Sequence, residues 1–410
     1  MISTGLLLRV LPPQLRATAS VFNALGRHIS TACHLTDDQL EFQKVARDFA
    51  RKELLPHASE WDEKKHFPVE TLRAAAQLGF GGLYIREDVG GSALGRADAA
   101  VIFEELAYGD ISTSAYLTIH NMVSHCIDRY GTEEQRQRYL PQLVSMDKLA
   151  SYCLTEPNSG SDAASLATSA KRDGSSYVLS GSKAFISGGG ASDVYLVMAR
   201  TGGPGPKGIS AFLVDKGIPG LSFGKQEAKT GWNAQPTCAV TLDAVQVPAD
   251  NLLGQEGQGF SIAMNALNGG RINIGACSLG GAAFCLDAAQ EHAAVRKQFG
   301  QAIGSFQAMQ FKLADMATSL HSARLMVRHA AESMDRQLSS ATLDAAMAKR
   351  HATEAGCRVA DDAMQVFGGY GYLKEYQVER VWRDLRVHRL LEGTNEIMNV
   401  IIARELMKQQ

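Results

Sequence analysis

The chain has 410 residues, of which 45% are hydrophobic and 20% are charged, and its formal net charge is −2. This is the composition of an ordinary globular protein, and the length calls for two or three packed units rather than one core. The charge balance gives no support for a nucleic-acid partner or an anionic membrane surface. No apolar run of about 18 residues predicts a transmembrane helix.

The N-terminal stretch differs from the rest of the chain. Its first 36 residues contain no acidic residue and carry Arg9, Arg16 and Arg27 among serine, threonine, leucine and alanine. This composition is typical of a mitochondrial transit peptide, which takes no part in the fold. An N-terminus that is simply unstructured is the alternative. We predict a transit peptide over residues 1–34 and a location in the mitochondrial matrix.

The seven cysteines are scattered through the chain. None forms a Cys-x-x-Cys pair or a Cys/His spacing typical of a metal site. We therefore expect free thiols in a reducing compartment, mostly packed in the core, and no bound metal.

Helical patterns dominate residues 35–149. A capping box at 36–39 predicts the start of a first helix, which Pro56 ends, and a second helix follows Pro68. After a glycine-rich loop, three more helical patterns cover residues 97–109, 114–130 and 133–145. We predict an N-terminal α-helical domain over residues 35–149.

Residues 150–254 have a different character. Short runs of β-branched and aromatic residues alternate with Gly, Pro and Asp turns, and no ten-residue helical pattern lies between them. This excludes a βαβ unit and favours antiparallel pairing in a small sandwich or barrel. The predicted strands cover residues 177–179, 194–198, 209–214 and 239–242.

Helical patterns return over residues 255–410. Four long ones cover 256–296, 306–336, 341–367 and 395–408, which predicts a helical bundle. The predicted fold class is therefore α+β: an N-terminal helical domain, a middle antiparallel β domain and a C-terminal four-helix bundle.

One carboxylate near the C-terminus stands out. Glu392 lies between Leu390-Leu391 and Gly393, just before the last predicted helix. Desolvation by Leu390, Leu391 and Ile397 would raise its pKa, whereas the helix N-terminus would favour the anion. A carboxylate poised between these effects suits proton abstraction. The alternative is an exposed glutamate at a turn.

Five motifs together identify a family. They cover residues 152–162, 181–188, 296–300, 365–372 and 392–394. Each is weak alone, but in this order and spacing they resemble the FAD-dependent acyl-CoA dehydrogenases, and the resemblance runs from about residue 35 to 408. It implies an acyl-CoA dehydrogenase-like fold and an oxidation that removes two hydrogens from adjacent carbons of an acyl-CoA thioester, with FAD as hydride acceptor.

The resemblance implies that Glu392 is the catalytic base. Its backbone N–H and a ribityl hydroxyl of FAD would donate to the thioester carbonyl. Some relatives take their base from an earlier helix, immediately before the arginine that matches Arg271. Here that position is Gly270, which has no side chain, so the base must come from Glu392.

Two segments are expected along the flavin. Thr155 would bond its pyrimidine edge, and Ser161 would lie between the flavin and the phosphates of the ligand. A Ser/Gly turn that ends a strand, and a Phe-Ile pair in the core, are the alternatives. The residues concerned are Tyr152, Cys153, Leu154, Thr155, Glu156, Pro157, Asn158, Ser159, Gly160, Ser161, Phe185, Ile186 and Ser187.

The resemblance also implies contacts to the dinucleotide half of FAD across a subunit boundary, and hence a homotetramer. Arg296 suits the pyrophosphate because its charge is permanent and forked. Phe306 is unusual, since near relatives have a polar residue there. A helix N-terminus after Glu392 would seat phosphate. The residues are Arg296, Phe306, Gln307, Gln365, Val366, Phe367, Gly368, Gly369, Thr394, Asn395 and Glu396.

A third set is expected at the substrate. Gly269 and Gly270 lie inside a helical pattern, where each glycine costs about 1 kcal/mol relative to alanine. They leave room either for close helix packing or for a branched acyl group or the pantetheine arm. Arg404 lies on an apolar stripe, where it either snorkels or contacts a CoA phosphate. The set is Ser161, Asn268, Gly269, Gly270, Arg271 and Arg404.

Three stretches favour a short branched substrate by their resemblance to particular members of the family, namely residues 185–187, 202–208 and 268–273. We expect isobutyryl-CoA to become methacrylyl-CoA, a step of valine breakdown, with electrons passing to electron-transferring flavoprotein. The alternatives are 2-methylbutyryl-CoA or butyryl-CoA as substrate. An inactive assembly protein with a dehydrogenase fold is a further alternative.

Overall fold

The computed structural model describes residues 35–408. The predicted transit peptide over residues 1–34 lies outside this range. The chain divides into two units at residue 40, and apart from the start of the first described helix the fold below is that of the second unit, residues 41–410. The predicted domain limits at residues 149 and 254 stay predictions.

The first described helix begins as expected. Thr36 and Gln39 form the capping box: each backbone N–H donates to the side-chain oxygen of the other at 3.2 Å. Helix α1 (Asp37–Phe49) continues into a π-helical turn, η2 (Ala50–Leu54). The helices that follow are α2 (Ala58–Lys64), α3 (Val69–Gln77), α4 (Arg96–Gly109), α5 (Ile111–Tyr130) and α6 (Glu133–Val144). Only α2, which is short and highly charged, is not among the predicted helices.

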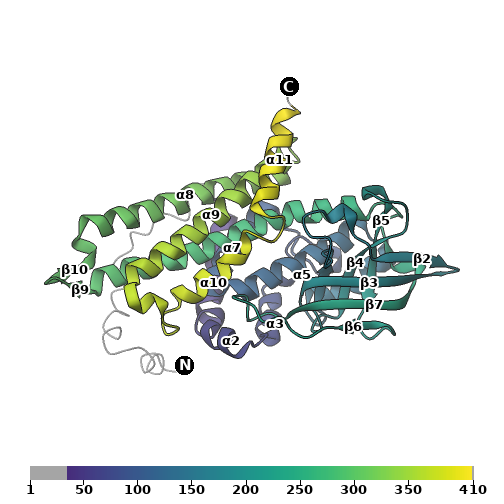
Figure 1. Cartoon of the computed structure of the whole chain (residues 1–410), viewed down its shortest axis with the longest axis horizontal. Coiled ribbons are helices and arrows are strands. Elements are labelled where there is room, and N and C mark those ends of the chain that lie inside the picture. Colours follow the sequence, from purple (N-terminus) through teal and green to yellow (C-terminus); the bar gives the residue numbers. More distant parts are fainter. Residues whose placement is uncertain (1–34, 409–410) are drawn as a thin grey trace. The chain divides into compact units, whose positions relative to one another are not determined.

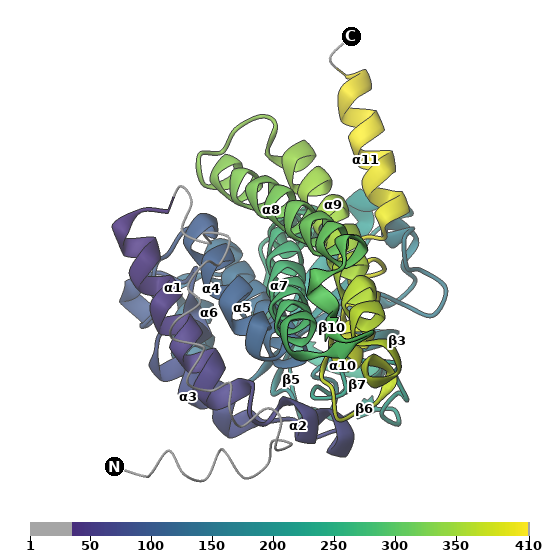
Figure 2. The same cartoon turned by 90° about the vertical axis from the view of Figure 1, so that its left-hand side faces the viewer.

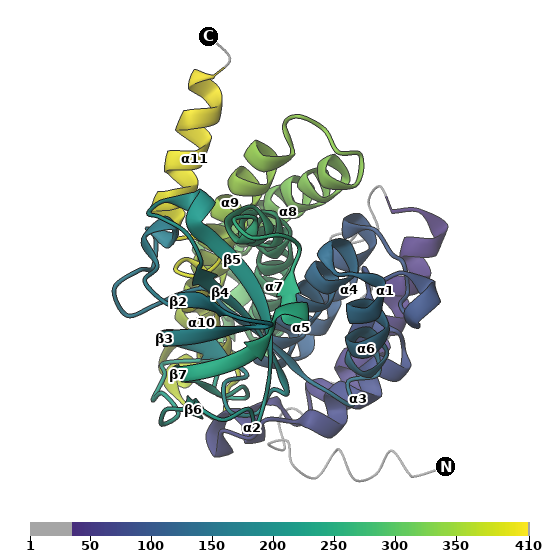
Figure 3. The same cartoon turned by 90° about the vertical axis from the view of Figure 1, so that its right-hand side faces the viewer.

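The middle of the chain forms one eight-stranded sheet (Figure 3). Its order is β6-β7-β3-β2-β4-β5-β8, and β1 pairs with β4 off this path. The pairing is antiparallel, as predicted, except that β1 and one residue of β2 pair in parallel with β4. The strands are β1 (Ala150–Cys153), β2 (Ser169–Asp173), β3 (Ser176–Ser187), β4 (Val194–Arg200), β5 (Ile209–Asp215), β6 (Leu221–Phe223), β7 (Thr237–Pro248) and β8 (Leu252–Leu253).

Both faces of β4 are covered. Leu196 and Met198 pack into a core shared with α5, α6 and α7, whereas Tyr195 and Val197 pack into the sheet's own core with β5 and β7. A strand buried on both faces has no polar alternation, which is why β4 and β5 appear in the sequence as continuous apolar runs.

The C-terminal helices are α7 (Gly259–Val295), α8 (Gln307–Asp335), α9 (Ala341–Phe367), α10 (Val378–His388) and α11 (Asn395–Met407). Helices α7, α8 and α9 run side by side (Figure 1). A small hairpin, β9 (Lys297–Gln298) and β10 (Gln301–Ala302), connects α7 to α8. Helix α10 is not among the four predicted helices, although Val378, Val381 and Leu385 have helical spacing and are buried.

Helix α7 is central to the second unit. It packs against α4 and α5 on one side and α8 and α9 on the other (Figure 2). Among the described helices it alone passes the length and composition test for a membrane span, but 78% of its apolar window is buried inside the protein. A core helix in this position needs the same apolar composition.

Candidate active site

The loop between α10 and α11 presents Glu392. Glu392 and Gly393 both adopt the left-handed conformation, with φ of 55° and 86°, which is uncommon for any residue except glycine. Thr394 then caps α11, because its side chain accepts a hydrogen bond from the Ile397 N–H at 3.2 Å. The helix expected beyond Glu392 therefore begins at Asn395, and the left-handed turn directs the carboxylate to α7.

The carboxylate lies directly against Gly270. A Cβ built at Gly270 would stand 2.3 Å from Glu392 Oε2, closer than real Cβ contacts come. A Cβ at Gly269 would instead stand 2.6 Å from the guanidinium of Arg96. The two adjacent glycines of α7 thus make room for two different side chains, one of them Glu392. A base at position 270 and a base at position 392 cannot share this space.

The carboxyl group is enclosed although Glu392 as a whole keeps some exposure. Oε2 is buried and has no hydrogen-bond partner within the described chain. This burial raises the pKa of Glu392 to about 7, against the opposing effect of the positive charges of Arg271 and Lys349. Leu390, expected to help desolvate it, is 53% exposed, so the cover comes from the surrounding elements instead.

Two buried cations hold the two consecutive backbone carbonyls that follow the Glu392 side chain. Arg271 Nε donates to the carbonyl oxygen of Glu392 at 3.3 Å. Lys349 Nζ donates to the carbonyl oxygen of Gly393 at 2.7 Å and to Asn395 Oδ1 at 2.9 Å. Lys349 is missed by sequence analysis, although a lone lysine on the alanine-rich buried face of α9 could have drawn attention to it.

A second polar group lies one helix position from Gly270. The Arg96 guanidinium stacks 3.7 Å from the centre of the Tyr84 ring, and the Tyr84 hydroxyl donates to Asn273 Oδ1 at 2.7 Å. Arg96 Nη1, Asn273 Nδ2 and the Tyr152 hydroxyl are buried without a partner in the described chain. Unpaired buried polar atoms are uncommon and call for an explanation, such as a ligand or ordered water. Sequence analysis misses Tyr84, Arg96 and Asn273.

The two predicted flavin segments lie together. The Ala184 N–H, beside Phe185 on β3, donates to the carbonyl oxygen of Thr155 at 2.9 Å. Phe185 is 69% exposed with a left-handed backbone, whereas Ile186 is in the core. The exposed Phe185 therefore fits the predicted flavin contact, whereas Ile186 fits the alternative of a core residue.

Within the 152–161 segment, inward and outward residues alternate irregularly. Glu156 is buried: it accepts from Lys183 Nζ at 2.7 Å and from the Thr168 N–H at 2.9 Å, which anchors the turn. The buried members of the segment are Cys153, Leu154, Glu156 and Ser159. The members that keep accessible surface are Tyr152, Thr155, Pro157, Asn158, Gly160 and Ser161.

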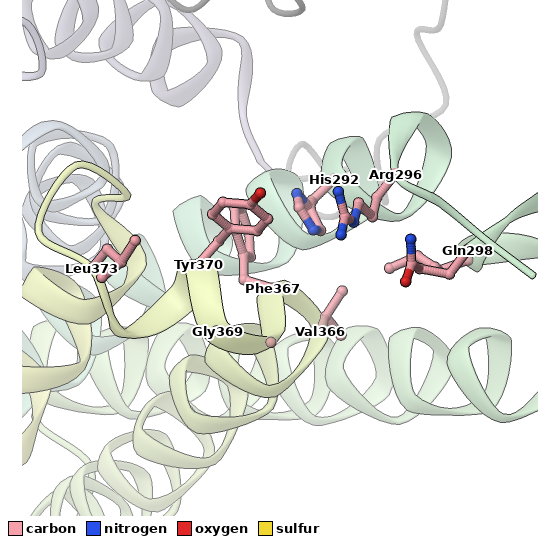
Figure 4. Close-up of a pocket in the computed structure, with 10 residues that line it drawn as sticks. His292, Arg296, Gln298, Val366, Phe367, Gly369, Tyr370 and Leu373 are labelled. Carbon is pink, nitrogen blue, oxygen red and sulfur yellow. The ribbon is translucent and has the colours of Figure 1, made fainter.

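A pocket of about 370 Å³ lies at the other end of α7 (Figure 4). It brings together predicted residues from two motifs, with Arg296 at 5.3 Å from the Tyr370 ring centre and His292 stacked on Phe367 at 4.2 Å. Gln365, Phe306 and Gln307 do not line it. The lining residues are His292, Arg296, Gln298, Ile303, Val366, Phe367, Gly368, Gly369, Tyr370 and Leu373.

The remaining predicted residues lie on α11, except Asn268, which lies on α7. Asn395 is buried and bonded to Lys349 and Thr353, so its side chain serves the loop itself. Glu396 is exposed on the first turn. Arg404 is mostly exposed and pairs with Glu405 at 3.4 Å. Asn268 accepts from Arg271 Nη1 at 2.5 Å.

The fold has a helical region, a β region and a second helical region, with an enclosed glutamate between its last two helices. This is the arrangement that the sequence resemblance predicts, and comparison with known proteins supports it. Three family models match in order: the acyl-CoA dehydrogenase N-terminal domain over residues 36–147, the middle domain over 151–245 and the C-terminal domain over 257–407. The chain therefore belongs to the acyl-CoA dehydrogenase family, and it is an enzyme acting on a CH–CH bond.

Two relatives and one structure make this more specific. The chain is 62% identical to mitochondrial isobutyryl-CoA dehydrogenase of Dictyostelium discoideum, over 91% of this chain and 90% of that protein. It is 55% identical to mitochondrial isobutyryl-CoA dehydrogenase of Bos taurus, over 93% of this chain and 92% of that protein. The structure of butyryl-CoA dehydrogenase from Megasphaera elsdenii matches with a TM-score of 0.89 at 40% identity, over 91% of this chain and 99% of that one.

Proposed function

We propose that this enzyme oxidises isobutyryl-CoA to methacrylyl-CoA in the mitochondrial matrix, with Glu392 as the base. The observation that carries the proposal is the enclosed carboxylate of Glu392 against Gly270. The two relatives at 62% and 55% identity, both named for this substrate, support the choice of acyl group.

The reaction takes a proton from the α-carbon and a hydride from the β-carbon. Glu392 accepts the α-proton, and a pKa raised to about 7 by burial makes it a stronger base than an ordinary carboxylate. The Glu392 N–H has no acceptor among the described residues. It is therefore available to the thioester oxygen, where such a donor contributes about 3–4 kcal/mol to an enolate-like transition state.

The residues present fit FAD, which when bound supplies the hydride acceptor. Phe185 offers an exposed aromatic face beside Thr155, and Ser187 lies at the end of the same strand. The backbone of Gly368 and Gly369 is open, since a Cβ at either glycine would meet nothing within 4 Å in the described chain. Arg296 offers a permanent charge for the pyrophosphate.

The two halves of this FAD site are contributed by different copies of the chain. Gly270 lies in α7 and Arg296 follows its last residue, so the two are separated along the helix by about 40 Å at 1.5 Å per residue. One dinucleotide does not reach both ends, so the Arg296 pocket serves a flavin bound in a neighbouring subunit. We infer a homotetramer and electron-transferring flavoprotein as the electron acceptor, in keeping with the family.

The space beside the base suits a short acyl group. Arg96 and Tyr84 stack next to Gly269, one position along α7 from Gly270 and Glu392. We infer that this stack bounds the end of the acyl site. Isobutyryl-CoA has a single α-hydrogen and a methyl branch, so it needs a short, wide space.

The test compares kcat/KM for isobutyryl-, 2-methylbutyryl-, butyryl- and isovaleryl-CoA, and follows flavin bleaching under anaerobic conditions. We expect a yellow protein that isobutyryl-CoA bleaches and prefers. A preference for butyryl- or 2-methylbutyryl-CoA would overturn the substrate. A colourless protein would instead support the inactive assembly protein.

A further inference from the structure

A fully buried lysine lies beside the base and has no part in the reaction described above. Lys349 is 0% exposed on α9, among alanines. Lysine is almost never fully buried unless its charge is paired or hydrogen-bonded. The position therefore calls for a specific use of the ammonium group.

The partners of that ammonium are in the loop that carries Glu392 and at the first residue of α11. Its two hydrogen bonds go to the Gly393 carbonyl oxygen and to Asn395 Oδ1. Asn395 is itself tied to α9, because its side chain donates to Thr353 Oγ1 at 3.0 Å and to Glu354 Oε1 at 2.9 Å. The segment immediately after Glu392 is thus fastened to α9.

This fastening counteracts an unfavourable backbone. A glutamate at φ 55° is in a sparsely populated region, and such conformations persist only where the surroundings over-determine them. Arg271 holds the carbonyl of Glu392 from α7, and Lys349 holds the next carbonyl from α9. Without Lys349 the turn would keep only one of its two cationic clamps.

The ammonium also acts on the charge of the carboxylate. Burial lowers the pKa of Lys349 to about 8, and the Glu392 carboxylate opposes this shift. In the reverse direction, Lys349 and Arg271 lower the pKa of Glu392. The other titratable or charged groups that act on the pair are Tyr152 on β1, Glu354 on α9, His388 at the end of α10 and Glu396 on α11. Around these, Arg404 faces Arg271 and Arg389 faces Glu396.

We propose that Lys349 is a positioning residue for the base: it holds the left-handed turn through the Gly393 carbonyl, one residue from Glu392, and its buried charge favours the ionised form of the Glu392 carboxylate. This inference rests on the proposed function, in which Glu392 takes the α-proton. It assigns Lys349 two separable effects, one on loop geometry and one on the charge of the base.

Two substitutions separate these effects in the full-length holoenzyme. Lys349→Met removes both the donor and the charge, whereas Lys349→Gln keeps an N–H donor and removes only the charge. We expect kcat to fall about 10–100-fold in Lys349→Met, because small displacements of a reacting group have effects of this size. The fall in Lys349→Gln should be clearly smaller.

The charge effect is measured from the pH profile of kcat/KM. Loss of a positive neighbour raises the pKa of Glu392, so the acidic limb of kcat/KM should move to higher pH by about one unit in both variants. A merely structural lysine would lower activity or thermal stability without moving this limb. Arg350→Met, at the next and exposed position of α9, is the matched control and should leave the limb in place.

An acidic limb that stays at the wild-type position in both variants would overturn the charge effect. Equal kcat in Lys349→Met and Lys349→Gln would overturn the loop effect. If Lys349→Met fails to fold, Lys349→Gln still decides the charge effect. Flavin bleaching of the wild-type enzyme by isobutyryl-CoA is measured alongside: without it the proposed function fails, and with it only the role of Lys349 is in question.

Discussion

The two ends of α7 carry candidate sites of opposite kinds. At Gly270 the site is closed: the Glu392 carboxylate, Arg271 and Lys349 are covered by the chain itself. At Arg296 the site is open, and large apolar side chains of its lining keep accessible surface, with Tyr370 40% and Leu373 45% exposed. Exposed clusters of large apolar side chains mark surfaces that another molecule covers.

This difference indicates which parts of the enzyme one chain completes by itself. The proposed proton-abstracting site needs no second copy, since its charges and backbone clamps all come from α7, α9 and the loop before α11. The Arg296 pocket, on the function proposed above, is completed by a cofactor and a neighbouring subunit. Substitutions at the closed site should therefore damage chemistry, and substitutions at the open site should damage assembly and cofactor retention.

The largest effect is expected at the closed site. Glu392→Gln removes the base while keeping the size of the side chain, so kcat should fall about 10²–10⁴-fold, the usual contribution of general base catalysis. FAD content and subunit assembly should stay at wild-type levels. Rapid-mixing measurement of flavin reduction gives the rate directly, and near-normal turnover would remove Glu392 from the mechanism.

A smaller loss is expected from Gly270→Ala. The added Cβ would meet Glu392 Oε2 at 2.3 Å, so the carboxylate must move, and a displacement of about 1 Å costs about 10²-fold in rate. Alanine also favours a helix by about 1 kcal/mol over glycine, so the melting temperature should not fall. A loss of activity without a loss of stability is the expected pair of results.

The matched control for this variant is Gly275→Ala, in the same helix. Its Cβ would come closest to the Val327 side chain, at 3.0 Å, with Ala352 Cβ at 3.7 Å and no part of Glu392 among its nearest neighbours. We expect the same gain in helix propensity with little change in kcat. Equal activity losses at positions 270 and 275 would mean that the contact with Glu392 is not what requires Gly270.

The open site should respond differently. Arg296→Ala should weaken FAD binding about 10–100-fold, the range for one hydrogen-bonded charge, and loosen the subunit assembly. Added FAD should restore activity to this variant but not to Glu392→Gln. Lys297→Ala, at the neighbouring exposed position, is the control, and loss of kcat that excess FAD does not rescue would break the distinction between the two sites.

The sequence predicts the elements better than their partners. Periodicity finds every long helix except α10, and it finds β4 and β5 because both faces are apolar. The parallel pairing of β1 with β4 is not predictable locally, because the chain passes through β2 and β3 between them. Strand order depends on tertiary packing rather than on turn chemistry.

The same distinction applies to the site, where single residues are predictable and their contacts are not. Glu392 can be found from its motif, and Gly270 from its place before Arg271. The contact between Gly270 and Glu392 joins residues far apart in the chain, and Lys349 bonds a backbone atom 44 residues away. A backbone acceptor leaves no mark in the sequence, so only the placing of a lysine among the alanines of α9 hints at Lys349. Tyr84 and Arg96 act through contacts with each other and with Asn273, for which the sequence offers no motif.

The smallest effect concerns stability and tests whether the Glu392 carboxylate is buried in the folded protein. The pKa of Glu392 in the folded protein is about 7, above its ordinary 4.5, so the folded state binds this proton more tightly than the unfolded state. The contribution of Glu392 to the free energy of unfolding is therefore most unfavourable above pH 7. This unfavourable contribution disappears as the pH falls from 7 to 4.5. Glu392→Gln lacks the buried charge at every pH.

We therefore expect Glu392→Gln to be more stable than the wild type at pH 8 by about 1–2 kcal/mol, about 5–30-fold in the folding equilibrium, and equal to it near pH 4.5. Thermal unfolding at the two pH values measures this difference. Glu396→Gln is the control of opposite sign, because the N-terminal backbone of α11 lowers the pKa of that exposed carboxylate. If Glu392→Gln gained no stability at pH 8, the carboxylate would be solvated rather than enclosed, and the contrast between the two ends of α7 would rest on the open pocket alone.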